Sequence, residues 1–238
     1  MNALVHKYWA ALTLLVLGAV SAMAAPVPVG RIAVLQYVSG SVSIQPRGTG
    51  NWAAAVPNQQ VAVTDNVWTD KDARAEINVG TGTLRMNSQT SLTLANLDRS
   101  TVQLRLNKGT LHLHIHHLFG GEVYEVNSRN GVFTVTKSGD YRFDVDPKAD
   151  VTTITVWKGE GTVSGERPVA KVHAHEQVRL HAVSAAYEKH KDPAPDGFDQ
   201  WCRTRNKLQD RAYPYPYGYP YPPGVIVYGR PGPWGYVR

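Results

Sequence analysis

Apolar and polar residues alternate along short runs through most of the chain, from residue 30 to about residue 182. Segments such as IAVLQYV, SLTLANL, TLHLHIH and TTITVW are rich in β-branched and aromatic residues, and Gly, Asn, Asp or Ser separate them. In this region we find no ten-residue window with the apolar period of a helix. The pattern therefore predicts an all-β domain over residues 30–182, built of many short antiparallel strands in a sandwich or a rolled, solenoid-like stack.

The pattern changes over residues 183–211, which we expect to form a helical segment docked on the β-domain. SAAYEKHK predicts a short helix that ends at Asp192-Pro193, and FDQWCRTRNKLQDR predicts a second one. Asp196 is the expected N-cap of the second helix, and Asp199 adds negative charge to its first turn. A narrow apolar stripe is expected to face the β-domain, formed by Phe198, Trp201, Cys202 and Leu208.

The two ends of the chain differ from this central part. Residues 1–24 have a weakly basic start, an apolar stretch and the small-x-small sequence Ala22-Met23-Ala24, which together predict a cleavable signal peptide. We therefore expect a periplasmic or secreted protein with no transmembrane span after cleavage. Residues 212–238 alternate Tyr, Pro and Gly, so we expect a flexible, polyproline-like tail.

Composition limits the classes of partner. The formal net charge is +6, and the Lys and Arg residues are spread along the chain, which argues against a nucleic-acid-binding surface.

Cys202 is the single cysteine, so an internal disulfide is ruled out. Its place on the predicted helix beside Trp201 favours a buried structural thiol over a nucleophile.

Histidines are concentrated in the segment GTLHLHIHH. Residues two apart in a strand share a face, so His112, His114 and His116 should point one way while the intervening residues point into the core. The plainest interpretation is a solvated strand face. The alternative is a site for Zn or Cu, in which two of these imidazoles reach one ion and a third requires a bulge. His173 and His175 could complete a mixed site if their segment pairs beside the first.

Other possible sites have structural explanations. Asp144, Asp146 and Asp150 lack the Gly and distal Glu of an EF-hand, so we predict a turn after a strand. Gly80-Thr81-Gly82 precedes a strand and predicts a hairpin turn, not a phosphate cradle. The sequence shows no convergent nucleophile and base, so we expect a non-enzymatic protein without a cofactor.

In the tail, tyrosines recur at every second residue, at Tyr213, Tyr215, Tyr217, Tyr219 and Tyr221. Two interpretations remain open. The segment is either a low-complexity spacer or an adhesive element whose rings stack on sugars, peptide grooves or similar tails.

The β-region resembles a FecR domain. The segments that carry the likeness are GSVSI at residues 40–44, VTDNVWTDKDARAEINVGTGTLRMN, LRLNKGTL at residues 104–111, the strands of residues 123–163, and HEQVRL. The Phe-Asp-x-Trp-Cys segment and the aromatic tail also resemble a subset of exported FecR-domain proteins. The regulators that give the family its name carry a cytoplasmic helical domain and a membrane span before the FecR domain, where this chain has the predicted signal peptide.

The resemblance implies a non-enzymatic cell-envelope protein whose β-domain recognises another envelope protein, in signalling or as a scaffold. Two alternatives remain open. One is a protein that binds cell-wall polymer or polysaccharide through the tail, and the other is a periplasmic metal-binding protein that uses the histidine strand.

Overall fold

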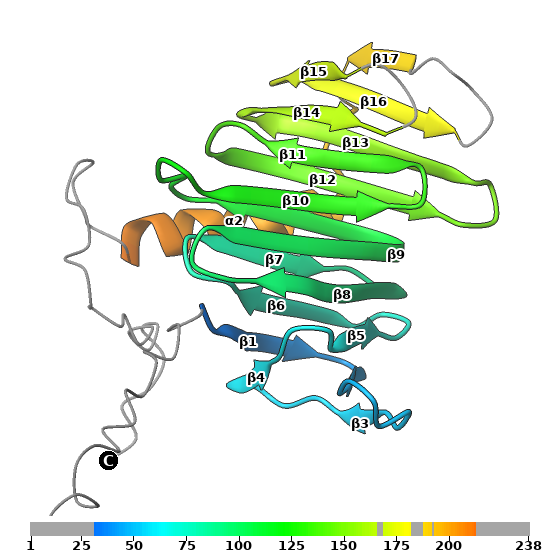
Figure 1. Ribbon diagram of the computed structural model, residues 1–238, viewed down its shortest axis with the longest axis vertical. Helices are drawn as coiled ribbons and strands as arrows, with labels where there is room; N and C mark the ends of the chain where they lie inside the picture. Colours follow the sequence, from blue (N-terminus) through cyan, green and yellow to red (C-terminus); the bar gives the residue numbers. More distant parts are fainter. Residues whose placement is uncertain (1–30, 166–168, 182–187, 192, 213–238) are drawn as a thin grey trace, which may run out of the picture.

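The computed structural model describes residues 31–165, 169–181, 188–191 and 193–212. The predicted signal peptide and the tyrosines of the tail lie outside these residues. Most of the described chain is β-strand, followed by one helix (Figure 1), so the predicted fold class is confirmed.

The strands form two sheets that share one long strand, β9 (Thr101–Ile115). Sheet A runs, in spatial order, through β4 (Gln59–Val61), β1 (Ala33–Ser39), β6 (Arg74–Asn78), β7 (Gly82–Met86), β9, β12 (Gly139–Asp146), β13 (Val151–Lys158), β16 (Glu176–His181) and β17 (Glu188–Lys191). Sheet B runs through β3 (Ala53–Ala54), β2 (Val42–Gln45), β5 (Asn66–Thr69), β8 (Thr90–Leu97), β9, β10 (Val123–Ser128), β11 (Gly131–Val135), β14 (Glu160–Ser164) and β15 (Ala170–His173).

The chain passes back and forth between the two sheets, and one continuous apolar core lies between them. Alternation along each strand explains this arrangement, because every second side chain points inward. In β9, the inward side chains Leu111, Leu113 and Ile115 are almost completely buried, as the sequence predicted. The adjacent Gly80-Thr81-Gly82 forms the predicted hairpin turn between β6 and β7.

β9 changes sheets at Gly109. Residues up to Lys108 pair with β8 in sheet B, whereas residues from Gly109 pair with β12 in sheet A. Gly109 has a φ of +90°, and a Cβ there would lie 2.5 Å from Thr90 Oγ1, so only glycine fits this corner. The corner places the histidine half of β9 in the middle of sheet A, between β7 and β12.

The expected short helix in SAAYEKHK is wrong for the part that the structure describes. Glu188–Lys191 forms β17, which pairs with β16 at the open edge of sheet A. A helix of two turns is marginal in water, whereas a strand at this edge gains backbone hydrogen bonds from β16.

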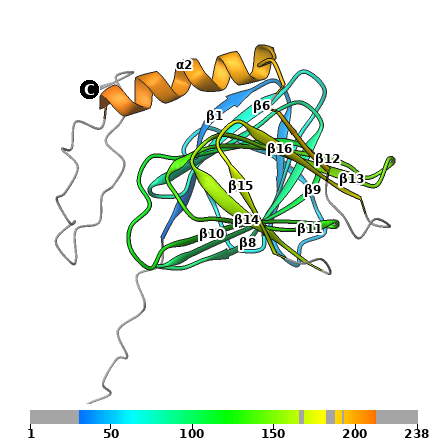
Figure 2. The same cartoon turned by 90° about the horizontal axis from the view of Figure 1, so that it is seen from above.

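The second predicted helix is present as α2 (Gly197–Ala212), which lies along the outer face of sheet A (Figure 2). Phe198 and Cys202 are buried as expected, but Leu208 is 52% exposed. Polar side chains of the last two turns face the sheet instead, among them Asn206, which is 7% exposed. Among the described helices, none is long and apolar enough to cross a membrane.

Candidate functional site

A layer of polar side chains lies between α2 and the outer face of sheet A. We call it the polar layer and define it by eleven residues: Glu76, Arg85, His112, His114, Asp140 and Arg142 from the sheet, and Asp199, Arg205, Asn206, Gln209 and Asp210 from α2. Outward-facing residues of β6, β7, β9 and β12 supply the sheet side of the layer. These residues alternate with core residues, which is why the sequence pattern resembled a solvated face.

The predicted solvated histidine face is wrong. His112 is 1% exposed and His114 is 7% exposed, because α2 covers this part of β9. His116 lies just beyond the strand and keeps about a third of its side chain exposed. The strand therefore presents its imidazoles to the helix, not to solvent.

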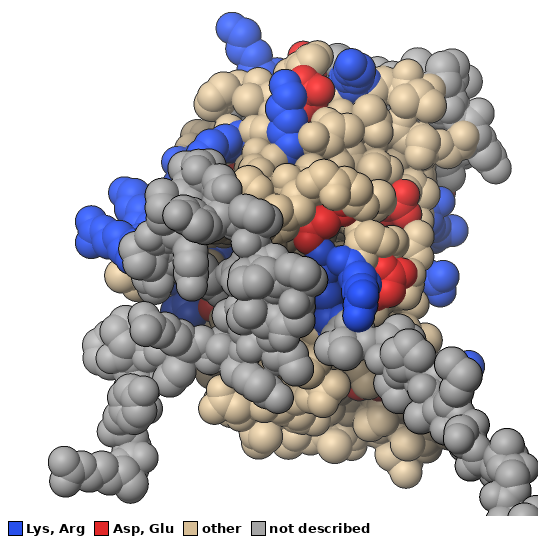
Figure 3. All heavy atoms as spheres, turned by 60° about the vertical axis from the view of Figure 1, so that its left-hand side comes forward, with Lys and Arg blue, Asp and Glu red and all other residues tan. Residues whose placement is uncertain are grey.

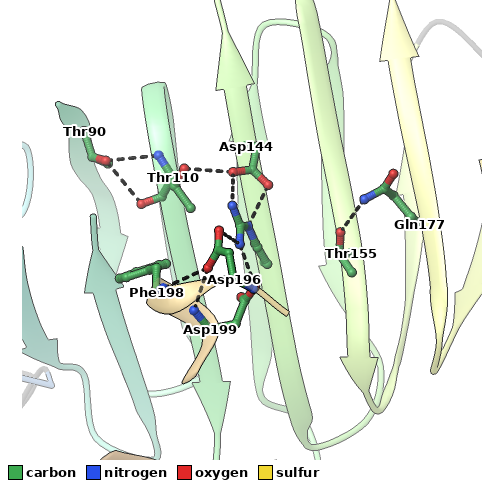
Figure 4. A network of polar contacts seen from close by, with 9 residues as sticks. Thr90, Thr110, Asp144, Thr155, Gln177, Asp196, Phe198 and Asp199 are labelled. Atoms are coloured by element: carbon green, nitrogen blue, oxygen red, sulfur yellow. Dashed lines mark hydrogen bonds and ion pairs between the residues drawn. The ribbon is translucent and has the colours of Figure 1, made fainter. Parts of the chain in front are cut away.

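The first turn of α2 is fixed by two aspartates and one arginine. Asp196 Oδ1 accepts hydrogen bonds from the backbone N–H groups of Phe198 and Asp199, at 2.8 and 2.9 Å. Asp199 accepts one in return from the backbone N–H of Asp196, at 3.0 Å, so the two form a capping box. Arg142 donates to both carboxylates at 2.7 Å and also to Asp144. Figure 4 shows Asp196 and Asp199 close to Asp144. This arrangement confirms the predicted cap and positions the start of the helix on β12.

The apolar part of α2 packs beside this cap. Cys202 is completely buried, and burial raises the pKa of its thiol to about 12, so it is a structural thiol, as predicted. The Trp201 ring lies 5.7 Å from the ring of Tyr37 on β1, and the guanidinium groups of Arg74 and Arg205 stack over it at 5.1 and 5.4 Å. These contacts fix the rotation of α2 on the sheet.

Glu76 is the central acceptor of the polar layer. It receives Arg85 Nε at 2.7 Å and Arg205 Nε at 2.6 Å, and it is 1% exposed. Burial by itself would raise the pKa of Glu76, but the hydrogen bond from Arg205 and the charge of Arg85 together lower it below 4.5. Arg85 is fully buried and also donates to Asn206 and Gln209 of α2. The Glu76 carboxylate of the sheet thus binds Arg85 of the sheet and Arg205 of α2, which links the helix to sheet A.

Asp140 is the second acceptor, on the β12 side, and its side chain is 21% exposed. It binds His114 Nδ1 at 2.8 Å and Asn206 Nδ2 at 2.5 Å. Burial would raise the pKa of Asp140, but the hydrogen bond from His114 and the nearby positive charges outweigh that effect and lower it to about 2. Asp140 is therefore an ionised acceptor at neutral pH.

His112 is separated from the other predicted metal ligands. Its Nε2 lies 3.9 Å from Asp140, and its Nδ1 has no hydrogen-bond partner in the described part of the chain. Burial lowers the pKa of His112 to about 3, so it is a neutral imidazole packed under the helix. Among the described residues, His112 is thus not part of the group of possible metal ligands that contains His114 and His116.

The structure instead brings His114 and His116 together with Asp210, from the last turn of α2. One ligand atom from each of the three residues lies within 4.8 Å of the other two. Sequence analysis missed Asp210, because only the docked helix brings residues 96 positions apart into contact. The available signal was an acidic residue on a helix that was predicted to dock on the β-domain.

The remaining predicted groups do not converge on this cluster. His173, on β15 of the other sheet, is exposed and bonds to Glu160 at 3.1 Å, and His175 lies in the turn before β16, so no mixed site with β9 forms. Asp146 accepts hydrogen bonds from the backbone within the turn between β12 and β13, which confirms the predicted turn. On the face in Figure 3, Lys and Arg side chains are spread among acidic ones.

A second surface feature lies at one end of the fold, where β3 and β4 are the outermost strands (Figure 1). Three large apolar residues are exposed there: Trp52 by 49%, Val56 by 57% and Val63 by 40%. Ala53 and Ala54 of β3 are exposed as well. We call these five residues the edge patch.

Two of three comparisons with known proteins found matches. Residues 65–161 match the family model described as FecR protein. Two crystal structures of a "putative anti-sigma factor" from Parabacteroides distasonis are similar in structure, each at 11% sequence identity. One superposes with a TM-score of 0.50 over 61% of this chain and 71% of that chain, and the other with 0.48 over 54% and 60%. This chain therefore covers less than two thirds of the length of the second structure. At 11% identity, the similarity to the structure with a TM-score of 0.50 indicates a shared fold and no more. The comparison with curated proteins found no match.

Proposed function

Because residues 65–161 match the FecR family model, we propose that this chain is a non-enzymatic, exported protein of the cell envelope that recognises another protein. The predicted signal peptide supports export. The similar structure with a TM-score of 0.50, described as a "putative anti-sigma factor", favours binding of a protein over other activities.

The observation that carries this proposal is the edge patch. β3 pairs with β2 on one side, and the described residues provide no strand on its other side. An open strand edge with exposed apolar residues is a place where another chain can add a strand and bury side chains. Burying the side chains of Trp52 and Val56 would each stabilise a complex by roughly 1.5–3 kcal/mol. The polar layer takes a structural role in this proposal, because it holds α2 in place.

A crosslinking pull-down from intact envelopes tests the proposal. Three full-chain forms are compared: the native sequence, the double variant Trp52→Ala/Val56→Ser, and the control Leu208→Ser. Leu208 is as exposed as Trp52 but lies on α2. We expect one protein partner to be captured by the native chain and the control, with at least about a tenfold loss for the double variant.

Two results would contradict the proposal. Equal capture by all three forms would show that the edge patch takes no part in recognition. Capture of wall polymer that disappears when residues 213–238 are removed would instead support the tail-mediated alternative.

A further inference from the structure

The cluster of His114, His116 and Asp210 has the spacing of metal ligands. Asp210 Oδ1 lies 3.4 Å from His114 Nε2 and 2.9 Å from His116 Nδ1. Around a tetrahedral Zn²⁺ ion with bonds of about 2.0–2.1 Å, neighbouring ligand atoms are about 3.3–3.4 Å apart. The ligand atoms of all three residues lie within 4.8 Å of one another, a separation that side-chain rotation can reduce to this spacing.

The hydrogen bond to Asp140 orients the His114 ring toward Asp210. Asp140 is a carboxylate that accepts hydrogen bonds only, so Nδ1 of His114 donates to it at 2.8 Å. The other ring nitrogen, Nε2, is directed at the Asp210 carboxylate, at 3.4 Å. A divalent cation at this position would take Nε2 of His114 and Oδ1 of Asp210 as ligands, on the side of the ring away from Asp140.

The residues behind the cluster form the support that a metal site requires. Histidine ligands of metals almost always donate their other N–H to a carboxylate or carbonyl, which fixes the tautomer and orients the ring. Asp140 plays this part for His114, and Asn206 of α2 holds Asp140 in turn at 2.5 Å. Asn206 is buried and the side chain of Asp140 is 21% exposed, whereas the side chain of Asp210 is 50% exposed, so the cluster is more accessible than its support.

We propose that His114, His116 and Asp210 bind a divalent transition-metal ion of the Zn²⁺ class. Two imidazoles and a carboxylate suit Zn²⁺, Cu²⁺ or Ni²⁺, and solvent completes the coordination. The ion joins β9 to the last turn of α2, so it also clamps the helix to sheet A. This inference is independent of the edge patch, which lies on other strands.

Direct binding is the first test. The untagged full chain, freed of metal by a chelator, is titrated with Zn²⁺ in competition with a chromophoric chelator. We expect micromolar or tighter affinity, and a loss of more than about 100-fold in His116→Ala and in Asp210→Ala, since replacing a residue that only orients a ligand already costs 10–100-fold. The matched control is His173→Ala, an exposed histidine that also faces a carboxylate but lies on β15. Equal affinity in all four proteins, or binding too weak to compete with the chelator, would overturn the proposal.

The clamp is tested through Cys202, which lies on the buried side of α2. Zn²⁺ should slow the reaction of this thiol with a thiol reagent, because the ion reduces transient detachment of the helix. In Asp210→Ala, Zn²⁺ should leave the rate unchanged, and this control excludes direct binding of Zn²⁺ to the thiol. Slowing of the same size in Asp210→Ala would refute the clamp.

Discussion

Replacing Glu76 by glutamine tests whether the polar layer stabilises the fold. The substitution keeps the shape of the side chain and removes its charge. In the native structure this carboxylate accepts four hydrogen bonds, from Arg85 at 2.7 Å, from Arg205 at 2.6 and 3.1 Å, and from Gln209 at 3.3 Å. Glu76→Gln leaves the fully buried Arg85 without its only carboxylate partner among the described residues.

The expected cost follows from this burial. Removing one partner of a buried ion pair lowers the free energy of unfolding by about 3–5 kcal/mol. The amide oxygen of glutamine still accepts from one arginine, and a hydrogen bond to a charged group recovers about 1.5–3 kcal/mol. The midpoints of these two ranges give an expected net loss of about 2 kcal/mol, a large part of the 5–15 kcal/mol that is typical of a domain.

Urea unfolding followed by tryptophan fluorescence measures this loss, with the m value checked for two-state behaviour. The control is Glu188→Gln on the exposed strand β17, which should change the free energy of unfolding by less than about 0.5 kcal/mol. A loss below about 1 kcal/mol for Glu76→Gln would refute the reasoning, because it would mean that water reaches this carboxylate when α2 is docked.

Acid should remove the same contribution. The pKa of Glu76 is lowered in the folded state, so its stabilisation is fully present above the unfolded value of 4.5 and is lost as the pH falls through the folded value. The difference between the native protein and Glu76→Gln should therefore be constant near neutral pH and shrink below pH 4.5. A difference that grows in acid would contradict the assignment.

Three further predictions concern other parts of the fold. Cys202 should react with thiol reagents at least about 100-fold more slowly in the folded protein than in urea, because it is buried and its pKa is raised to about 12. Equal rates in both states would show that α2 is detached. Gly139→Ala should lower the free energy of unfolding by about 3 kcal/mol or more, since its Cβ would lie 2.0 Å from the carbonyl oxygen of Lys158, whereas Gly120→Ala has open space and should change it little. Similar melting temperatures for both glycine variants would contradict the close approach of β12 to Lys158. Asp196→Ala should cost about 1–2 kcal/mol through loss of the cap, and Asp196→Asn, which keeps the cap, should cost less; helix content and urea midpoints measure both, and equal losses would mean that the charge matters more than the cap.

The sequence was sufficient for the β-fold because its alternation is regular and its turns are marked by glycine and polar residues. The leucines of β9, the hairpin at Gly80–Gly82 and the cap at Asp196 all follow from local rules. Each of these features depends on residues close together in the chain.

The polar layer could not be predicted in the same way. A strand face rich in Arg, His and Asp has the same pattern whether water or a polar helix covers it. Burial of His112 depends on α2, which begins more than 80 residues later. The predicted apolar stripe on α2 included Leu208 because hydrophobicity was the only criterion, whereas the helix docks its last turns through Arg205, Asn206 and Gln209.

Site-specific photocrosslinking at the edge patch tests the proposed protein recognition most directly. A photoreactive phenylalanine analogue replaces Trp52 in one protein and Leu208 in a second, and both are irradiated in intact envelopes. We expect a discrete crosslinked protein from position 52 that is absent from position 208. Crosslinks from position 208 alone, or the same products from both positions, would contradict recognition through the edge patch.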